Sequence, residues 1–562
     1  MMRVLSEKQA QLIGRIEMGI CLTATLLAVW LHVTYLTHAG ALWRDEASGV
    51  QLANSNDTSA SWRLAHESYP AFFSTLVRVW STLGLGASDV TLRVLGFLIG
   101  LGLLGAMWLN ARIMGFRLPF ISLGLLAANA TVVIWGDSLR AYGCGSLFIL
   151  ITLGLVWKLV QAPGRTSFLL ATLAAILSVQ TLFQNAFLVL AACIAGGVVC
   201  ARHRQWKTAG LVFGVGLVAG ASLIPYIPLI IESQSWWILQ KVEFNFAMIW
   251  NDMMLAGGSL MDWPLMDWPF WMWLGLIPLA LGAGLAALLQ RTKSAGIGRE
   301  DLPLYGASAL VAGIAGFLVF LRISELPTQL WYYLPIMVVA ATAMDGALAN
   351  WCRRFRVWPA AFLVIMVGLL FFPTLQYAGC RQTNIDLIAA ELQNRAEPGD
   401  FIVVNPWQCG ITFERYYKGR TPWTTLPALG DYHFHRYDLL KEKMRVIHPI
   451  KPELERAAQT LASGHTLWLV IIQAPDAIPA QTEPPDPPPA PIPNSQWPWW
   501  EGYYTYAWKE QLKYFVAAHA EQKEYIPVKP EIPVNGYENL SLIRASGWRE
   551  KTEAQPGPTA SP

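Results

Sequence analysis

Long runs of apolar residues recur along the chain up to about residue 377, separated by short polar connections. A helix that spans a bilayer needs about 20 consecutive apolar residues, and these runs have about that length. They predict about eleven transmembrane helices, near residues 16–38, 90–110, 118–136, 142–161, 167–181, 184–201, 208–231, 270–290, 303–321, 331–350 and 357–377. We therefore expect residues 1–377 to form a polytopic α-helical membrane domain.

Lys and Arg concentrate in alternate connections between the apolar runs, and this indicates the orientation of the helices. Cytoplasmic loops of membrane proteins are enriched in Lys and Arg. When the N-terminal segment, with Arg3, Lys8 and Arg15, is placed in the cytoplasm, the other inward connections are basic and the outward connections are acidic or neutral. This pattern predicts insertion in the cell (inner, cytoplasmic) membrane with the N-terminus inside and the chain after about residue 378 outside.

Two of the outward loops are long, at residues 39–89 and 232–269. The first contains a segment, residues 71–83, in which apolar side chains recur at helical spacing. The residues on this face are Phe72, Leu76, Val79, Trp80 and Leu83. Such a face predicts an amphipathic helix that lies in the membrane interface.

After residue 378 the composition changes to that of a folded extracytoplasmic domain. Apolar strand-like runs alternate there with helix-like stretches, which predicts a small α/β domain over residues 378–474 and 499–546. We expect helices near 384–396, 453–463 and 500–522 and strands near 401–404, 467–472 and 537–544. A Pro-rich stretch, 475–498, is predicted to be a stiff, exposed insertion or linker, and residues 547–562 a disordered tail.

Composition supports the membrane assignment and excludes several classes of partner. Hydrophobic residues make up 54% of the chain and charged residues only 14%, so a lipid bilayer is the expected surrounding. The net charge of +3, with no single basic patch, argues against a nucleic-acid partner. The seven Cys residues show no metal-ligand spacing. Cys380 and Cys409 lie in the polar C-terminal part, so a disulfide between them is an open alternative if that part faces an oxidising compartment.

Charged residues beside the membrane mark three candidate functional loops, because such residues are costly there unless they are used or paired. The first motif is Trp43-Arg44-Asp45-Glu46, directly after the first apolar run. The second is His66-Glu67-Ser68-Tyr69-Pro70, and the third is Asp137-Ser138-Leu139-Arg140-Ala141-Tyr142. All three are expected on the outer side, so their carboxylates could converge over one cavity.

These three motifs resemble those of the GT-C superfold of polytopic glycosyltransferases. The resemblance is to the branch that contains protein O-mannosyltransferases and bacterial lipid A aminoarabinose transferases. Members have an acidic pair at the start of a long first outward loop, matched here by Arg44-Asp45-Glu46, and a second acidic and Arg-x-Tyr element matched by residues 137–142. Glu67-Ser68-Tyr69-Pro70 corresponds to an element before the interfacial helix. The resemblance implies a GT-C-like fold and a polyprenyl-phosphate-linked sugar donor, and it covers residues 10–200 best.

Sugar transfer of this kind needs a base that removes the acceptor's hydroxyl proton and positive charge where the phosphate leaves. We expect Asp45 to be the base, and Glu46 to point about 100° away from it if both are helical. The catalytic residues are therefore predicted to be Asp45, Glu46 and Asp137. The substrate-binding residues are predicted to be Arg44, Glu67, Tyr69, Arg140, Tyr142 and Arg322, with the arginines as candidates for the donor phosphate.

Structural roles are the alternative for each of these residues. Asp45 could cap a helix over residues 46–53, and Asp137 could form an ion pair with Arg140. Glu67 could pair with a neighbouring arginine, and Arg322 could be a snorkelling residue at a helix end. His433 and His435 have no acidic or Cys companions in sequence and are interpreted as loop residues.

The sequence therefore predicts an inverting glycosyltransferase that moves a sugar from a polyprenyl-phosphate donor to an extracytoplasmic acceptor, whether lipid, glycan or protein. A divalent cation could be held by Asp137 and Glu67, but family members often have His where this chain has Tyr69, so the metal requirement stays open. The alternative function is a membrane transporter or lipid flippase. It is less favoured because the chain shows no internal repeat or paired broken helices of the kind that transporters have.

Overall fold

The computed structural model describes residues 7–56, 69–259, 267–290, 296–355, 357–472, 482–528 and 530–550. The chain divides into two compact units. The helical unit comprises Met1–Gly40, Leu52–Ser233 and Val242–Cys380, and the sheet unit comprises Ala41–Gln51, Gln234–Lys241 and Arg381–Pro562. Residues 41–51, which carry the first acidic motif, therefore belong to the unit formed mainly by the C-terminal part.

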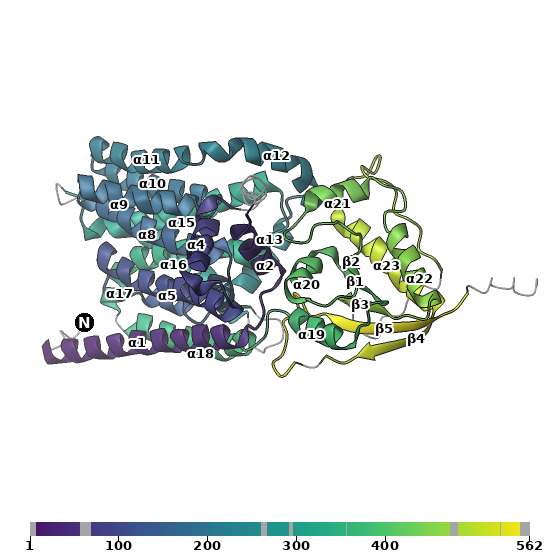
Figure 1. The fold of residues 1–562 in the computed structure, drawn as a ribbon. Helices are drawn as coiled ribbons and strands as arrows, with labels where there is room; N and C mark the ends of the chain where they lie inside the picture. Colours follow the sequence, from purple (N-terminus) through teal and green to yellow (C-terminus); the bar gives the residue numbers. More distant parts are fainter. Residues whose placement is uncertain are drawn as a thin grey trace, which may run out of the picture. The chain divides into compact units, whose positions relative to one another are not determined.

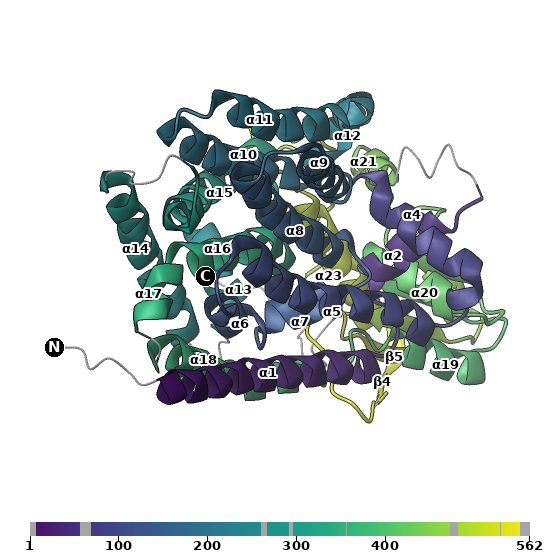
Figure 2. The ribbon, with the colours of Figure 1, turned by 90° about the vertical axis from the view of Figure 1, so that its left-hand side faces the viewer.

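The helical unit is that of a multi-pass membrane protein. Among the described residues, nine helical segments are long and apolar enough to cross a bilayer. They are Gln11–His38 within α1 (Glu7–His38), α5 (Asp89–Met114), α8 (Ala141–Gln161), α10 (Asn185–Arg202), Trp206–Gln240 with α11 (Trp206–Ala221) and α12 (Ile227–Trp237), α14 (Trp268–Leu289), Arg299–Ser324 with α15 (Leu302–Ser324), Leu330–Ala347 with α16 (Leu334–Ala347), and α18 (Val357–Ala378). In both views α1 and α18, the first and last of them, pack side by side (Figures 1 and 2).

The predicted count of eleven spans is not confirmed. The expected span 118–136 is two short helices, α6 (Phe120–Leu126) and α7 (Ala130–Gly136). The side-chain oxygen of Asn129 accepts hydrogen bonds from the backbone N–H groups of Thr131 and Val132 and so starts the second helix. The expected span 167–181 is α9 (Arg165–Val179), whose 15 residues are shorter than a bilayer-spanning helix needs to be.

The remaining helices of this unit are shorter. They are α4 (Ala71–Trp80), α13 (Phe246–Ala256) and α17 (Ala349–Arg354). α4 matches the expected interfacial helix and continues as a π-helical turn, Ser81–Leu85. Its buried side chains are Phe73 and Val77, whereas Val79 and Leu83 of the predicted apolar face are exposed.

The sheet unit contains a five-stranded mixed sheet in the order β2-β1-β3-β5-β4. β1 (Phe401–Asn405) is parallel to β2 (Trp423–Thr425) and to β3 (Leu467–Ile471). β5 (Ser541–Trp548) is antiparallel to β3 and to β4 (Ala520–Ile526). The helices are α19 (Ile385–Arg395), α20 (Gly410–Tyr416), α21 (Tyr437–Met444), α22 (Lys451–Ala462) and α23 (Glu501–His519), and α2 (Arg44–Ala53) begins in this unit (Figure 1).

Both faces of the sheet are covered, because successive strand side chains point to opposite faces. Phe401 and Val403 of β1 pack in one core with side chains of α21, α22 and α23. Ile402 and Val404 pack in a second core with side chains of α19 and α20. This arrangement confirms the expected fold class, a polytopic helical domain followed by a small α/β domain.

The Pro-rich stretch lies between β3 and α23 as an insertion, but its described part is not exposed throughout. Ala490 is buried, and its backbone N–H donates to the carbonyl of Met444 at 2.8 Å. The hydroxyl of Tyr504 donates to the carbonyl of Pro488 at 2.7 Å. Residues 482–498 form no helix or strand. The buried side chain of Ala490 and these two hydrogen bonds hold the segment against the domain.

Candidate functional site

The acidic motif after the first membrane helix lies in the first turn of α2. Because this helix begins at Arg44, Asp45 is not the cap residue that precedes a helix over 46–53. Both Asp45 and Glu46 are close to the positive end of the helix dipole, which favours carboxylates. Their side chains differ in access: Glu46 is fully buried, whereas the side chain of Asp45 is 16% exposed.

The carboxylate of Asp45 lies beside two groups that can carry positive charge. Its Oδ1 is 3.4 Å from Nε of Arg44 and 3.7 Å from Nε2 of His435. These contacts give the carboxylate a polar surrounding on both sides. Asp45 is thus a partly exposed carboxylate in a polar setting, as a base that must reach an acceptor requires.

His435 is a loop residue, as its sequence suggested, yet the fold places it beside Asp45. Its ring stacks on Tyr437, with centroids 5.8 Å apart, and meets the Trp407 ring edge to face at 6.1 Å. Trp407 is in turn fixed, because its Nε1 donates to the buried carboxylate of Glu501 at 3.0 Å. Sequence reasoning missed this neighbour because no local pattern connects residue 435 with residue 45.

Glu538 anchors the start of α2. Its Oε2 accepts a hydrogen bond from the backbone N–H of Arg44 at 2.8 Å. Its Oε1 accepts from the hydroxyls of Thr412 at 2.6 Å and Thr383 at 3.1 Å. Burial raises the pKa of Glu538 to about 7, although these donors and the charge of Arg44 lower it. The candidate base therefore sits on a helix whose first residue is held by a buried carboxyl group.

Asp137 lies at the C-terminal end of α7 in the helical unit, and its side chain is only 2% exposed. Its carboxylate oxygens are 2.8 and 2.9 Å from Nδ1 of His32, on α1. Gly100 makes room for the pair, since a Cβ there would lie 1.8 Å from Oδ1 of Asp137. The suggested ion pair with Arg140 is therefore wrong, and His32 is the partner. Sequence reasoning missed His32, although a histidine within the first apolar run is a signal that could have drawn attention to it.

Arg140 precedes α8 and is held by aromatic rings. Its guanidinium carbon lies 5.0 Å from the ring centroid of Tyr142 and 4.6 Å from that of Trp331. The Trp331 ring also meets Trp135 at 4.5 Å. Cation–π contacts of this kind hold a guanidinium in one orientation. The two rings therefore fix the direction of the Arg140 guanidinium beside the start of α8.

The contacts of the other expected site residues, Arg322 and Tyr69, do not point to a substrate. Arg322 is 64% exposed and pairs with Glu325 at 2.7 Å, one helical turn away, as a surface ion pair does. Tyr69 contacts Phe73 edge to face at 6.1 Å. Glu67 lies outside the described residues. The first motif lies in the sheet unit and the third in the helical unit, and residues 66–68 of the second lie outside the described residues, so the convergence of the three stays a prediction.

Neither a metal site nor a disulfide is found in the part of the chain that the structure describes. No group of three or more His, Cys, Asp or Glu side chains there could hold a metal ion. Cys380 and Cys409 are both free thiols, and Cys409 is buried. The disulfide alternative between Cys380 and Cys409 therefore finds no support.

Comparison with known proteins gives no match to a family model and none to a characterised relative. The solved structures that are similar to the chain include two of ArnT. The crystal structure of ArnT from Cupriavidus metallidurans bound to undecaprenyl phosphate is 14% identical, with a TM-score of 0.47 over 82% of this chain and 93% of that chain. ArnT from the same organism in the apo state is 15% identical, with a TM-score of 0.37 and the same coverage. At this sequence identity and these TM-scores, the similarity assigns no activity to the chain. The activity proposed below is argued from the chain's own residues.

Proposed function

We propose that this chain is an inverting glycosyltransferase that moves a hexosyl or pentosyl group from a polyprenyl-phosphate donor to an acceptor outside the cytoplasm. The observation that carries the proposal is the Asp45 carboxylate, partly exposed between Arg44 and His435 in the first turn of α2. The resemblance of the three motifs to GT-C enzymes supports the donor class. Among the described residues, nine helical segments are long and apolar enough to span a bilayer, which is where a lipid-linked donor would be held.

In the proposed reaction the acceptor hydroxyl oxygen attacks the anomeric carbon as Asp45 takes its proton. A new C–O bond forms, and the bond between the anomeric carbon and the phosphate oxygen breaks. The leaving polyprenyl phosphate keeps the bonding electron pair. Attack from the face opposite the leaving group inverts the anomeric centre. His435, held by Tyr437 and Trp407, keeps the carboxylate in place.

Arg140 is the residue that we propose for the donor phosphate. A planar guanidinium can donate two parallel hydrogen bonds to phosphate oxygens, and its charge offsets the negative charge that grows on the leaving group. The rings of Tyr142 and Trp331 hold this group in one orientation before the donor binds. Asp137, buried against His32, supports the fold of this loop rather than meeting a substrate.

The test is Asp45→Asn in membranes supplied with labelled polyprenyl-phosphate sugars. The amide keeps the size of the side chain but cannot accept the proton, so we expect transfer to fall by about 100- to 10,000-fold. Asp89→Asn is the matched control, because Asp89 also lies in the first turn of a helix, α5. The control should transfer at the wild-type rate.

Two results would contradict the proposal. Transfer by Asp45→Asn at the wild-type rate would remove Asp45 as the base. A wild-type chain that transfers none of the sugars but moves a solute across sealed vesicles would favour the transporter alternative.

A further inference from the structure

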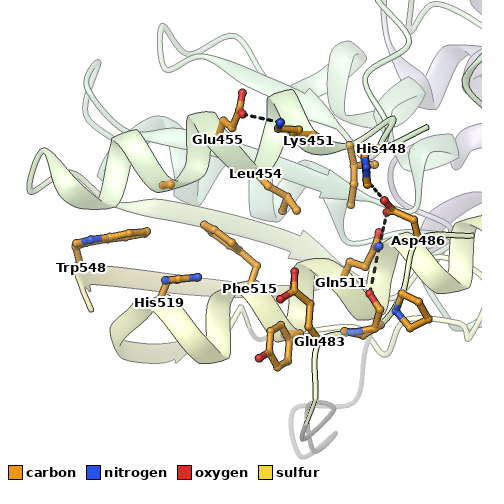
Figure 3. Close-up of a pocket in the computed structure, with 15 residues that line it drawn as sticks. His448, Lys451, Leu454, Glu455, Glu483, Asp486, Gln511, Phe515, His519 and Trp548 are labelled. Atoms are coloured by element: carbon orange, nitrogen blue, oxygen red, sulfur yellow. Dashed lines mark hydrogen bonds and ion pairs between the residues drawn. The ribbon is translucent and has the colours of Figure 1, made fainter. Parts of the chain in front are cut away.

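The sheet unit contains a cleft that the proposed transfer reaction does not use. Its volume is about 700 Å³, which lies within the range of small-molecule sites. It is bounded by α22, by α23 and by the segment around Asp486 (Figure 3). None of the residues that the sequence nominated for catalysis or donor binding lines it.

One end of the cleft is aromatic. The ring of Trp548, at the end of β5, stacks on the ring of His519 with centroids 4.8 Å apart and an angle of 5°. The ring of Phe515 follows, 5.0 Å from His519. Figure 3 shows the three side chains next to one another along the cleft. Flat rings of this kind offer a large apolar contact to a ligand with a flat apolar face.

The other end is polar and presents donors together with acceptors. Asp486 accepts a hydrogen bond from Nε2 of Gln511 at 2.6 Å and pairs with His448. Nζ of Lys451 lies 3.8 Å from Oε1 of Glu455, and both side chains are exposed. Mixed donors and acceptors suit hydroxyl groups, because a hydroxyl both donates and accepts.

The charges at the cleft argue against an anion. Three carboxylates, Glu455, Glu483 and Asp486, line it against a single lysine, Lys451. A phosphate or an acidic glycan would therefore meet net negative charge. From the cleft, its aromatic end and its mixed polar end, we propose that the sheet unit binds a neutral saccharide of one to about three rings. The rings of the sugar would lie on Trp548 and Phe515, and its hydroxyls would bond to the polar end.

The experiment measures binding to the full-length chain in nanodiscs by saturation-transfer difference NMR. The probes are neutral di- and trisaccharides of glucose, galactose, mannose and N-acetylglucosamine. We expect at least one to bind with a millimolar or lower Kd, and Trp548→Ala to weaken it by at least about tenfold. Tyr506→Ala is the matched control, because Tyr506 is an exposed aromatic residue on α23 that does not line the cleft.

A second variant keeps the test valid if Trp548→Ala unfolds. Lys451→Ala/Glu455→Ala removes two exposed side chains with no net change in charge and is expected to weaken the same saccharide severalfold. The inference does not depend on transfer, so Asp45→Asn should bind the saccharide as the wild type does.

Three results would overturn the inference. They are no binding of any probe to the wild type, equal affinity in the wild type and in both cleft variants, and displacement of the saccharide by trilysine or by inorganic phosphate. The last result would identify a charged ligand instead.

Discussion

Replacing Glu538 with Gln tests how the first turn of α2 is held. The Gln carbonyl can still accept from the backbone N–H of Arg44, and the Gln NH₂ can donate to the hydroxyls that now donate to Glu538. The hydroxyl of Thr412 already has a second acceptor, the carbonyl of Cys409 at 3.1 Å. We therefore expect Glu538→Gln to fold and to behave like the protonated wild type at every pH.

The magnitude follows from the pKa of Glu538, which burial raises from an ordinary value of 4.5 to about 7. A carboxyl group with a higher pKa in the folded state binds more protons there, so the unfolding free energy falls as pH rises. The fall occurs between pH 4.5 and about pH 7, and a pKa difference of about 2.5 corresponds to about 3 kcal/mol. Glu538 is fully buried, so solvent screens little of this effect.

Hydrogen exchange of the peptide that covers residues 41–51 reports this free energy locally. In the wild type, the opening free energy of this peptide should decrease by about 2.5 kcal/mol from about pH 5 to about pH 8, after correction for intrinsic exchange. In Glu538→Gln the decrease should disappear. An equal decrease in both proteins would show that another group, such as the buried Glu501, causes it and would refute the reasoning.

Two further substitutions test the helical unit. Arg140→Lys should lower the transfer rate about 10- to 100-fold, because an ammonium cannot make the two parallel hydrogen bonds of a guanidinium. Arg322→Lys, at an exposed position, is the control and should leave the rate unchanged. Equal transfer rates in Arg140→Lys and the wild type would contradict the phosphate-binding role of Arg140. Gly100→Ala should lower the free energy of unfolding by about 1–3 kcal/mol, because the added Cβ would meet the carboxylate of Asp137. Gly105→Ala on the same helix is the control, because a Cβ there meets nothing within 4 Å. Equal melting temperatures of the two variants would contradict the close packing of Gly100 against Asp137.

The sequence predicted most reliably the strands that are buried on both faces. β1 and β3 are such strands, and their unbroken apolar runs are typical of central parallel strands. β4 was missed because its five central residues are exposed and mostly polar, as in an edge strand, so its pattern continued that of the preceding helix. The break at Asn129 was missed because the surrounding run is apolar enough to read as one helix.

The candidate site could be predicted only where its residues are close in sequence. The position of Asp45 directly after an apolar run was sufficient to nominate it. The tertiary contacts of the two described motifs were not predictable, because Arg44 and Glu538 lie 494 residues apart and His32 and Asp137 lie 105 apart. Contacts at such separations depend on tertiary folding, which local periodicity does not encode.

The contacts of the acidic motif assign a role to the sheet unit. Three successive residues, Leu42 directly before the motif and Trp43 and Arg44 within it, are held by residues of the C-terminal part. The backbone N–H of Leu42 donates to the hydroxyl of Tyr416 at 2.7 Å, the Trp43 ring lies 6.0 Å from that of Tyr537, and the N–H of Arg44 bonds to Glu538. Because Asp45 follows directly, the position of the proposed base depends on the folding of this unit. The C-terminal domain is therefore part of the proposed catalytic apparatus, whatever else it binds.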